Sequence, residues 1–386
     1  MDSHPPYLPE EIILNILKRL PVESLIRFQC VCKHWNNLIK SPSFIADHLQ
    51  QSSHQNPSLL LDCNNSCSPL RWRLRLLDWG MQVRLVQKAP LVDSFGGASI
   101  IGSCNGLVCV QIHQDDKSPP SLSLWNPATT AVRHVPRPRI FSDLEDYMTG
   151  FGFSPIVNDY KIVRTYSKFY YEVDRAEVFS LSRGSWKRID SGNLKAVRLN
   201  SEAVTTNGAI FWSGLKLDAD EDGEDGVQVI ARVIVSFDIV KEVFTLSPWP
   251  DLNLNCTSGD EKLTIYGNKL AILCDVWRRD NERFDLIRLW VMEEGTCAFG
   301  ERRNWTKIYT SPFSKTFDPV TIWRNQIVYT RGGSAVPSKK GRTVHLMNLT
   351  TNEVKRFVVP CCGSIKNIYN YVESLVSVGN NYIEES

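Results

Sequence analysis

Residues 8–35 read LPEEIILNILKRLPVESLIRFQCVCKHW and form a short, heavily apolar helical pattern, whereas almost everything after residue 70 reads as β-sheet. Pro9 suits the first turn of a helix, and Pro21 ends that helix one residue after Leu20. The apolar residues of this first helix cover an arc of about 140°, and one neighbouring element covers a stripe of only roughly 100°. The stretch therefore predicts a helix with more apolar surface than a single neighbour would bury.

The helical pattern resumes after Pro21 and has a bend near Cys30. The sequence SPSF at 41–44 then looks like the start of another short helix, which runs to about Leu49. Two interpretations of this helical segment remain open from the pattern alone. It is either a cap that folds onto the following domain, or a docking module whose free face binds another protein.

The same residues resemble an F-box over its whole length. The matching elements are Leu-Pro at 8–9 and 20–21, Ser-Leu at 24–25, Cys-Lys-His-Trp at 32–35 and Ser-Pro-Ser-Phe at 41–44. The resemblance implies a three-helix F-box domain over residues 5–49 that binds a Skp-type adaptor, and through it a cullin–RING scaffold. It also implies a set of adaptor-binding residues, which are Leu8, Pro9, Ile12, Ile16, Leu20, Pro21, Leu25, Val31, Cys32 and Trp35.

Residues 50–69 are rich in Ser, Asn, Gln and Pro, and they predict a linker with one short strand at Leu59–Leu61. Residues 70–380 form a loose repeat in which each unit has two apolar hairpins. The polar turn of the first hairpin falls near residues 105, 158, 207, 267 and 325, and Asn-Gly or a related pair at these turns supplies the positive φ of tight hairpins. Two hairpins make a four-stranded sheet, and a period near 50 is typical of kelch-like repeats.

Five such units are complete, and a sixth sheet could combine residues 71–86 with the C-terminal IYNYVESLVSV. That sheet would close a ring by pairing the start of the β region with its end. Strict kelch signatures and Trp-Asp dipeptides are absent, so the repeat is degenerate. The predicted fold class is therefore an α+β multidomain chain, with a small helical F-box before an all-β, degenerate kelch-like β-propeller. A pair of β-sandwiches is the alternative for the β region.

The β region also resembles the F-box-associated domain of plant F-box proteins over most of residues 95–380. The phrases that match are NGLVCV, LWNPATTAVRHVP, GFGFSPIVNDYKIVR, AEVFSLSRGSWKRI, IVSFDIVKEVF and YVESLVSV. This resemblance implies a plant source and a domain that recognises a target protein.

Composition narrows the possible partners and compartments. The chain has 44 basic and 42 acidic side chains and a formal net charge of +2, so neither nucleic acid nor a membrane surface is expected as a partner. No stretch approaches the length of a membrane-spanning helix, and the start MDSHPPYLPEE does not resemble a signal peptide. We therefore expect the protein in the cytoplasm, the nucleus or both, where thiols stay reduced.

Three motifs suggest chemistry, and none is convincing. GSCNG at 102–106 would make Cys104 a nucleophile, but the following residues predict a strand rather than the helix of a nucleophile elbow. DADEDGEDG at 218–226 begins like a calcium loop but has Val229 where a bidentate Glu is needed. Cys63 and Cys67 have no second pair at zinc spacing. We therefore predict no catalytic, cofactor-binding or metal-binding residues.

The predicted function is the substrate-recognition subunit of a Skp–cullin–F-box ubiquitin ligase, which is non-catalytic itself and binds an unidentified target protein through the β domain for ubiquitination and proteasomal degradation. One alternative is an adaptor-bound scaffold without a ligase role, and another is a propeller enzyme with a helical cap. The candidate target-binding segments are charged or polar and lie between strand patterns, at 142–147, 218–225, 278–284 and 331–342.

Overall fold

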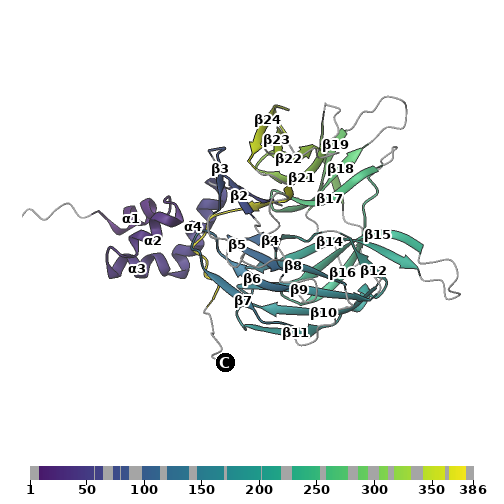
Figure 1. Cartoon of the computed structure of the whole chain (residues 1–386), viewed down its shortest axis with the longest axis horizontal. Helices are drawn as coiled ribbons and strands as arrows, with labels where there is room; N and C mark the ends of the chain where they lie inside the picture. Colours follow the sequence, from purple (N-terminus) through teal and green to yellow (C-terminus); the bar gives the residue numbers. More distant parts are fainter. Residues whose placement is uncertain are drawn as a thin grey trace, which may run out of the picture.

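The computed structural model describes residues 8–55, 57–63, 73–78, 80–86, 98–113, 120–138, 146–168, 172–200, 202–218, 228–252, 258–276, 286–293, 304–311, 317–331, 342–360 and 365–379. A small group of helices projects from one side of a larger β domain (Figure 1). The predicted order of a helical part followed by an all-β part is confirmed.

The described residues contain four α-helices rather than the three of the predicted F-box. They are α1 (Glu10–Leu17), α2 (Val22–Phe28), α3 (Lys33–Lys40) and α4 (Pro42–Gln55). The expected bend near Cys30 separates α2 from α3, because Cys32 is extended and its Sγ accepts a hydrogen bond from the Trp35 backbone at 3.4 Å. Helix α4 continues past the predicted end near Leu49 to Gln55.

The strands in the described residues form six sheets, which we call blades 1 to 6. Blade 1 has the strand order β25 (Ile365–Tyr371), β1 (Ser58–Cys63), β2 (Arg73–Leu77) and β3 (Val83–Leu85). Blade 2 contains β4 (Ala98–Cys104), β5 (Leu107–Ile112), β6 (Ser121–Trp125) and β7 (Val132–Val135). Blade 3 contains β8 (Asp146–Ser154), β9 (Asp159–Lys168), β10 (Glu172–Ser180) and β11 (Ser185–Ile189).

The remaining blades follow the same antiparallel order. Blade 4 contains β12 (Val197–Leu199), β14 (Ala209–Asp218), β15 (Gln228–Asp238) and β16 (Val243–Pro248), and β13 (Val204–Thr206) also pairs with β14. Blade 5 contains β17 (Ser258–Tyr266), β18 (Lys269–Val276), β19 (Leu286–Met292) and β20 (Trp305–Thr310). Blade 6 contains β21 (Phe317–Trp323), β22 (Gln326–Arg331), β23 (Arg342–Asn348) and β24 (Val354–Val359).

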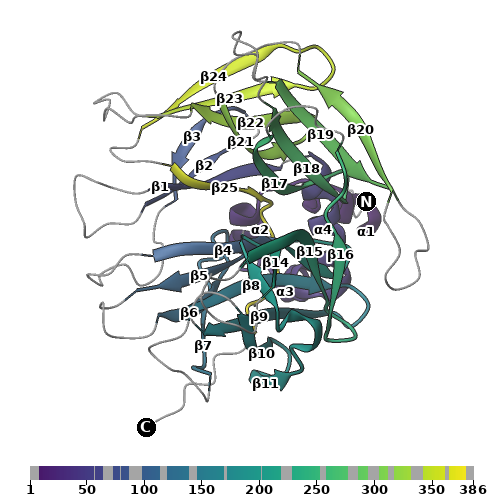
Figure 2. The ribbon, with the colours of Figure 1, turned by 90° about the vertical axis from the view of Figure 1, so that its right-hand side faces the viewer.

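The innermost strands form a closed ring. β25 contacts β4, and successive contacts run through β8, β13, β17 and β21 back to β25. Figure 2 looks onto this ring with the helices behind it. The ring closes because β25 from the end of the chain pairs with β1, for example Leu61 with Ile368. The predicted propeller and its closure by a sixth sheet are confirmed, and the alternative of two sandwiches is wrong.

The predicted linker over residues 50–69 needs a correction. Residues 50–55 belong to α4, and residues 58–63 form the fully buried strand β1 in the middle of blade 1. The sequence suggested a linker because its polar composition resembles that of loops. Strand β1 is stabilised by its pairing with β25, more than 300 residues away in the sequence, so no local signal marks its full extent.

Asn residues form several of the tight turns, as predicted. Asn105, Asn158 and Asn207 have φ of 51°, 46° and 49°, and Gly106 and Gly208 follow two of them with φ of 81° and 71°. Gly106 also has no room for a side chain, because an added Cβ would lie 2.2 Å from the Ser374 Oγ. These turns connect the first and second strands of their blades, and they place all first-to-second connections on one face of the ring, which we call the turn face.

Apolar packing between blades supplies most of the core. One cluster joins blade 3 to blade 4 through residues such as Val163, Val178, Trp212 and Phe237, each at most 1% exposed. Fully burying such side chains contributes about 1.5–3 kcal/mol each. The alternating strand pattern thus gives every blade two apolar faces that its neighbours cover.

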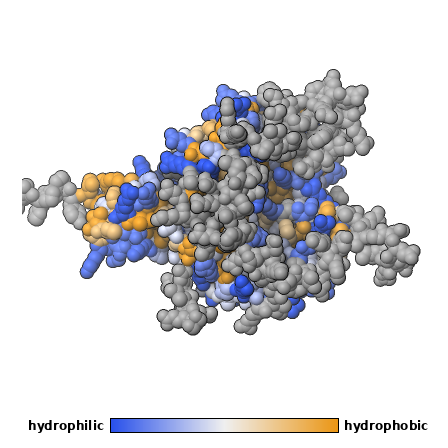
Figure 3. Space-filling view, viewed as in Figure 1, coloured by the Kyte–Doolittle hydropathy of each residue, from blue (hydrophilic) through white to orange (hydrophobic). Residues whose placement is uncertain are grey.

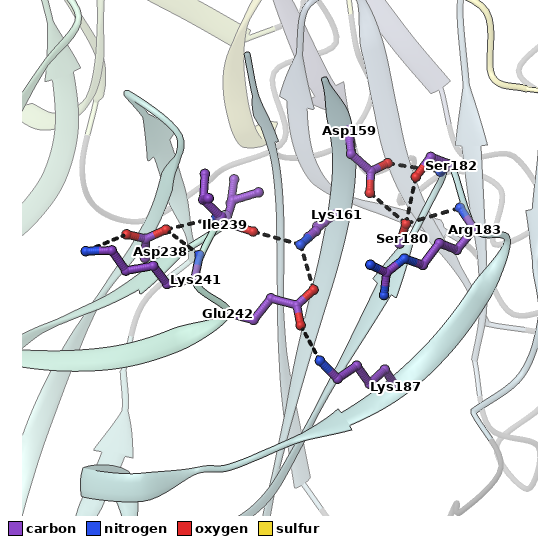
Figure 4. Close-up of polar contacts among 11 residues, drawn as sticks. Asp159, Lys161, Ser180, Ser182, Arg183, Lys187, Asp238, Ile239, Lys241 and Glu242 are labelled. Atoms are coloured by element: carbon purple, nitrogen blue, oxygen red, sulfur yellow. Dashed lines mark hydrogen bonds and ion pairs between the residues drawn. The ribbon is translucent and has the colours of Figure 1, made fainter. Parts of the chain in front are cut away.

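A polar contact also ties blade 3 to blade 4 beside the turn face (Figure 4). The Lys161 Nζ donates to the Ile239 carbonyl at 2.7 Å and to the Glu242 Oε1 at 2.6 Å, and the Lys187 Nζ donates to the Glu242 Oε2 at 2.7 Å. Partial burial alone would raise the pKa of Glu242, but the two lysine hydrogen bonds outweigh it, so the pKa is lowered. Glu242 is therefore held as a carboxylate that neutralises the nearly buried Lys161.

Candidate adaptor-binding face and propeller channel

Apolar side chains are exposed along one face of the helical part, which we call the free face. Leu8 is 52%, Ile12 45%, Ile16 48% and Val31 62% exposed. Ile12 and Ile16 are one helical turn apart on α1, so they share a side of that helix. Orange, apolar residues gather at this outer end of the helices in Figure 3. The free face therefore has no cover within the described chain.

Other apolar residues of the same helices form an internal core. Leu17, Val22, Leu25, Ile39 and Phe44 are buried together, and Leu375 from the C-terminal segment joins them. Leu25 is 0% exposed, so it packs inside the helical domain in this conformation, and its role as an adaptor contact stays a prediction. Its spacing in the sequence is the same whether the residue faces inward or outward, and only the packing of α2 against α3 and α4 decides between them.

The structure separates the ten predicted adaptor-binding residues by exposure. The exposed ones are Leu8, Pro9, Ile12, Ile16, Pro21, Val31 and Cys32. Leu20 and Trp35 are half-buried, and the Trp35 ring packs 5.4 Å from that of Phe28, centroid to centroid. Ile26 on α2 is 36% exposed and was not among the predicted contacts. The apolar pattern of the sequence does not distinguish it from the buried apolar residues of the same helix. Binding of an adaptor by these residues remains a prediction.

The helical part is anchored to the propeller by residues 372–379, which we call the C-terminal strap. The Asn126 side chain donates to the carbonyls of Ser374 at 2.9 Å and Val376 at 2.8 Å, and the Ser374 Oγ donates to the Asn105 carbonyl at 2.8 Å. Leu375 inserts into the core of the helices. The strap therefore holds the helical part against the turn face of the ring, beside blade 2.

A charged residue of the strap also meets the start of a helix. Burial raises the pKa of Glu373, and a hydrogen bond from the Val22 backbone at the first residue of α2 partly offsets this rise. Val22 itself is 0% exposed. The free face, on the other side of these helices, is thus held in one orientation relative to the propeller.

The centre of the ring contains a cavity of about 820 Å³. Its wall comes from the inner strands of several blades, including Phe151 of β8, Lys262 and Thr264 of β17 and Asn370 of β25. We call this cavity the channel. The inner strand of blade 4 is interrupted between β12 and β13, and Glu202 lies in this interruption.

Glu202 crosses the channel to the opposite blade. The Asn367 Nδ2 donates to the Glu202 Oε1, and the Tyr369 hydroxyl lies 3.3 Å from the Glu202 Oε2. Asn367 and Tyr369 belong to β25 in blade 1, which is three blades away from blade 4 around the ring. Enclosure by the channel wall raises the pKa of Glu202, and the hydrogen bonds from Asn367 and Tyr369 oppose this rise.

The structure gives no support to the other chemical motifs. Cys104 ends β4 at a hairpin turn, and burial raises the pKa of its thiol to about 12, which disfavours a thiolate nucleophile. Among the described residues, no group of three or more His, Cys, Asp or Glu side chains is placed to hold a metal ion. Within the same part of the chain, no helix is long and apolar enough to cross a membrane. Several residues that the sequence singled out lie outside the described residues. They are Cys67, residues 219–226 of the calcium-like motif, and residues 142–145, 219–225, 278–284 and 332–341 of the candidate target-binding segments.

A small helical domain with an uncovered apolar face, attached to a propeller by the C-terminal strap, defines a two-part binding protein. Comparison with protein-family models matches residues 6–47 to the F-box domain and residues 84–375 to the F-box associated beta propeller domain. The chain therefore belongs to the F-box proteins that have an F-box associated β-propeller. The predicted family is thereby confirmed.

The chain is also similar to curated relatives from Arabidopsis thaliana. The chain is 26% identical to F-box protein CPR1, a match that covers 94% of this chain and 91% of that protein. It is also 26% identical to F-box protein At3g07870, with 82% of this chain and 77% of that protein covered. Among solved structures, the β-propeller domain of the Trilobed protease from Pyrococcus furiosus is 14% identical, with a TM-score of 0.36 over 67% of this chain and 70% of that chain. That similarity is too low to support an inference about function.

Proposed function

We propose that this chain is the substrate-recognition subunit of a Skp–cullin–F-box ubiquitin ligase. The observation that supports this most directly is the free face, which exposes Leu8, Ile12, Ile16 and Val31 on an otherwise well-packed helical domain. The family membership supports the same general role. In this role the chain performs no bond chemistry, and it accelerates ubiquitin transfer by holding a target near the charged carrier at high effective concentration.

The free face would bind a Skp-type adaptor, and through it a cullin–RING scaffold. Each of the four side chains leaves about half of its surface uncovered, and covering that half contributes about 1 kcal/mol. Four such contributions are sufficient for the apolar centre of a specific interface. Without the adaptor, the same side chains would favour aggregation.

The target would bind the face of the ring opposite the helices. Strands alternate in direction within each blade. The end of each second strand and the start of each third strand therefore lie on that face, and so do the strand ends that lead from one blade to the next. The strand ends that flank the candidate segments at 142–147, 218–225, 278–284 and 331–342 all lie on that face. The helices and the strap occupy the turn face (Figures 1 and 2). The proposed arrangement therefore leaves the target face unobstructed, with the complex acting in the cytoplasm, the nucleus or both.

Reconstitution tests this proposal. The full chain is co-expressed with a Skp-type adaptor, purified, and combined with a cullin, a RING subunit and the ubiquitin enzymes, together with proteins captured from plant extract by the same complex. We expect the adaptor to co-purify and a captured protein to be ubiquitinated only when the full chain is present. Failure of the adaptor to co-purify would contradict the proposal. Co-purification without ubiquitin transfer to any captured protein would instead favour a scaffold without a ligase role.

A further inference from the structure

The channel has the size of a small-molecule site and no role in the proposed function. Its volume of about 820 Å³ lies within the usual range for ligand pockets, which is about 300–1,000 Å³. Thr264, Asn268 and Asn370 bring uncharged polar groups to its wall, and Glu202, Lys262 and Arg232 bring charge to it. A cavity of this kind, with a few convergent polar groups, is where ligands bind most often.

Glu202 has unused capacity for hydrogen bonds. A carboxylate offers about four acceptor positions, and the Asn367 amide occupies one of them. The Tyr369 hydroxyl lies 3.3 Å from the Glu202 Oε2 and 2.7 Å from the Ile100 carbonyl, so its single hydrogen is shared between the two acceptors. Both partners of Glu202 come from the opposite side of the ring, so they hold the carboxylate within the channel. The Glu202 side chain is nevertheless accessible from the channel. It is therefore an oriented anion that a donor entering the channel can reach.

The charges around Glu202 favour a cation. Asp62 on β1 is 1% exposed, and its negative field acts on Glu202 more strongly than the opposing field of Lys262. Arg232 contributes little net charge, because its guanidinium pairs with the Glu261 carboxylate and donates to the Glu261 carbonyl at 2.9 Å. A positive charge entering the channel would therefore meet the Glu202 carboxylate at a site that the channel wall partly encloses.

We infer that the channel is a binding site for an organic cation, with an ammonium or guanidinium group at Glu202. The geometry that supports this is the oriented carboxylate and its unused acceptor positions inside a cavity of ligand size. Two sources share this chemistry, namely a Lys or Arg side chain of a bound protein and a free amine. The inference depends only on the channel, so it stands whether or not the chain acts in a ligase.

Calorimetry on the purified complex of full chain and adaptor tests the inference with defined probes. One arm uses n-butylammonium with neutral butanol as its control. The other uses a capped glycine–lysine–glycine peptide with its norleucine counterpart as control. We expect saturable binding of the charged probes only, at about millimolar affinity for such small ligands. Tighter binding of the peptide would point to a protein side chain, and tighter binding of butylammonium to a free amine; either result supports the site.

Charge variants make the test specific. Glu202→Gln should weaken binding of the charged probes by about ten-fold or more, because a charge-assisted hydrogen bond is lost. Lys262→Met should strengthen binding, because it removes the opposing positive charge. Glu353→Gln, an exposed carboxylate on the β23–β24 turn, should leave binding unchanged. An unchanged thermal midpoint establishes that each variant is folded. An unchanged rate of adaptor exchange establishes that the substitution does not affect the adaptor interaction.

Two results would overturn the inference. The first is absence of saturable binding of both charged probes to the wild-type complex. The second is binding that Glu202→Gln leaves at the wild-type affinity in a folded complex. Either result would leave the adaptor-binding role untouched, since adaptor exchange is measured on the same samples.

Discussion

The double substitution Ile12→Ala and Ile16→Ala tests whether the free face binds the adaptor. The two side chains are 45% and 48% exposed, and full burial of an Ile contributes about 1.5–3 kcal/mol. Covering the exposed half of each therefore contributes about 1 kcal/mol, so the double variant should lose about 2 kcal/mol of binding free energy. That loss corresponds to roughly 30-fold in affinity. Folding should be little affected, because both residues are exposed and Ala has a higher helix propensity than Ile.

The assay measures exchange of the adaptor on the purified complex, so the free chain is never needed. Labelled adaptor in the complex is chased with excess unlabelled adaptor, and most of the affinity loss should appear as faster dissociation. The matched control is Ile156→Ala with Val157→Ala on the turn between β8 and β9, where the side chains are 81% and 43% exposed. Exchange at the wild-type rate by the folded Ile12/Ile16 variant would refute the reasoning, as would equal acceleration by the control variant.

Three further predictions concern the stability of the fold. Leu25→Ala should lower the free energy of unfolding by about 2–5 kcal/mol in urea titrations, because Leu25 is 0% exposed in the helical core, and an unchanged midpoint would contradict its buried placement. Glu242→Gln should lower the thermal midpoint at neutral pH. Since the folded pKa of Glu242 lies below its ordinary value, the difference from wild type should disappear as the pH falls through that lowered pKa, and a difference independent of pH would count against the lysine contacts. Gly150→Ala should destabilise the chain by about 1–3 kcal/mol, because its Cβ would lie 2.4 Å from the Trp212 ring, whereas Gly102→Ala, with its nearest atom at 3.7 Å, should be nearly neutral when both are compared by calorimetry.

The candidate adaptor-binding face was only partly predictable from the sequence. The prolines and the wide apolar arc are local features, and they correctly indicated a helical domain with apolar surface to spare. The sequence did not determine which apolar residues face inward, because the residues of the internal core and those of the free face recur with the same helical period. Leu25 and Ile16 illustrate this difference, since the first is buried and the second is 48% exposed.

The channel was not predictable from the sequence. Glu202 lies in an unremarkable stretch, and its partners Asn367 and Tyr369 are 165 and 167 residues away. The contact exists only because the ring places blade 4 opposite blade 1. The C-terminal strap is similar, because Asn126 reaches Ser374 across 248 residues and Leu375 has no local reason to join a helical core.

The sequence by itself determined the helices, the tight Asn turns and the repeat of four-stranded sheets, because proline, positive φ and alternating burial act within a few residues. Only the tertiary structure decided which apolar helical residues remain uncovered, that the short strand predicted at Leu59–Leu61 is the fully paired strand β1 of blade 1, and which charges meet inside the channel. The first outcome depends on how the four helices pack against one another. The other two depend on contacts between segments far apart in the sequence, which form only when the ring closes.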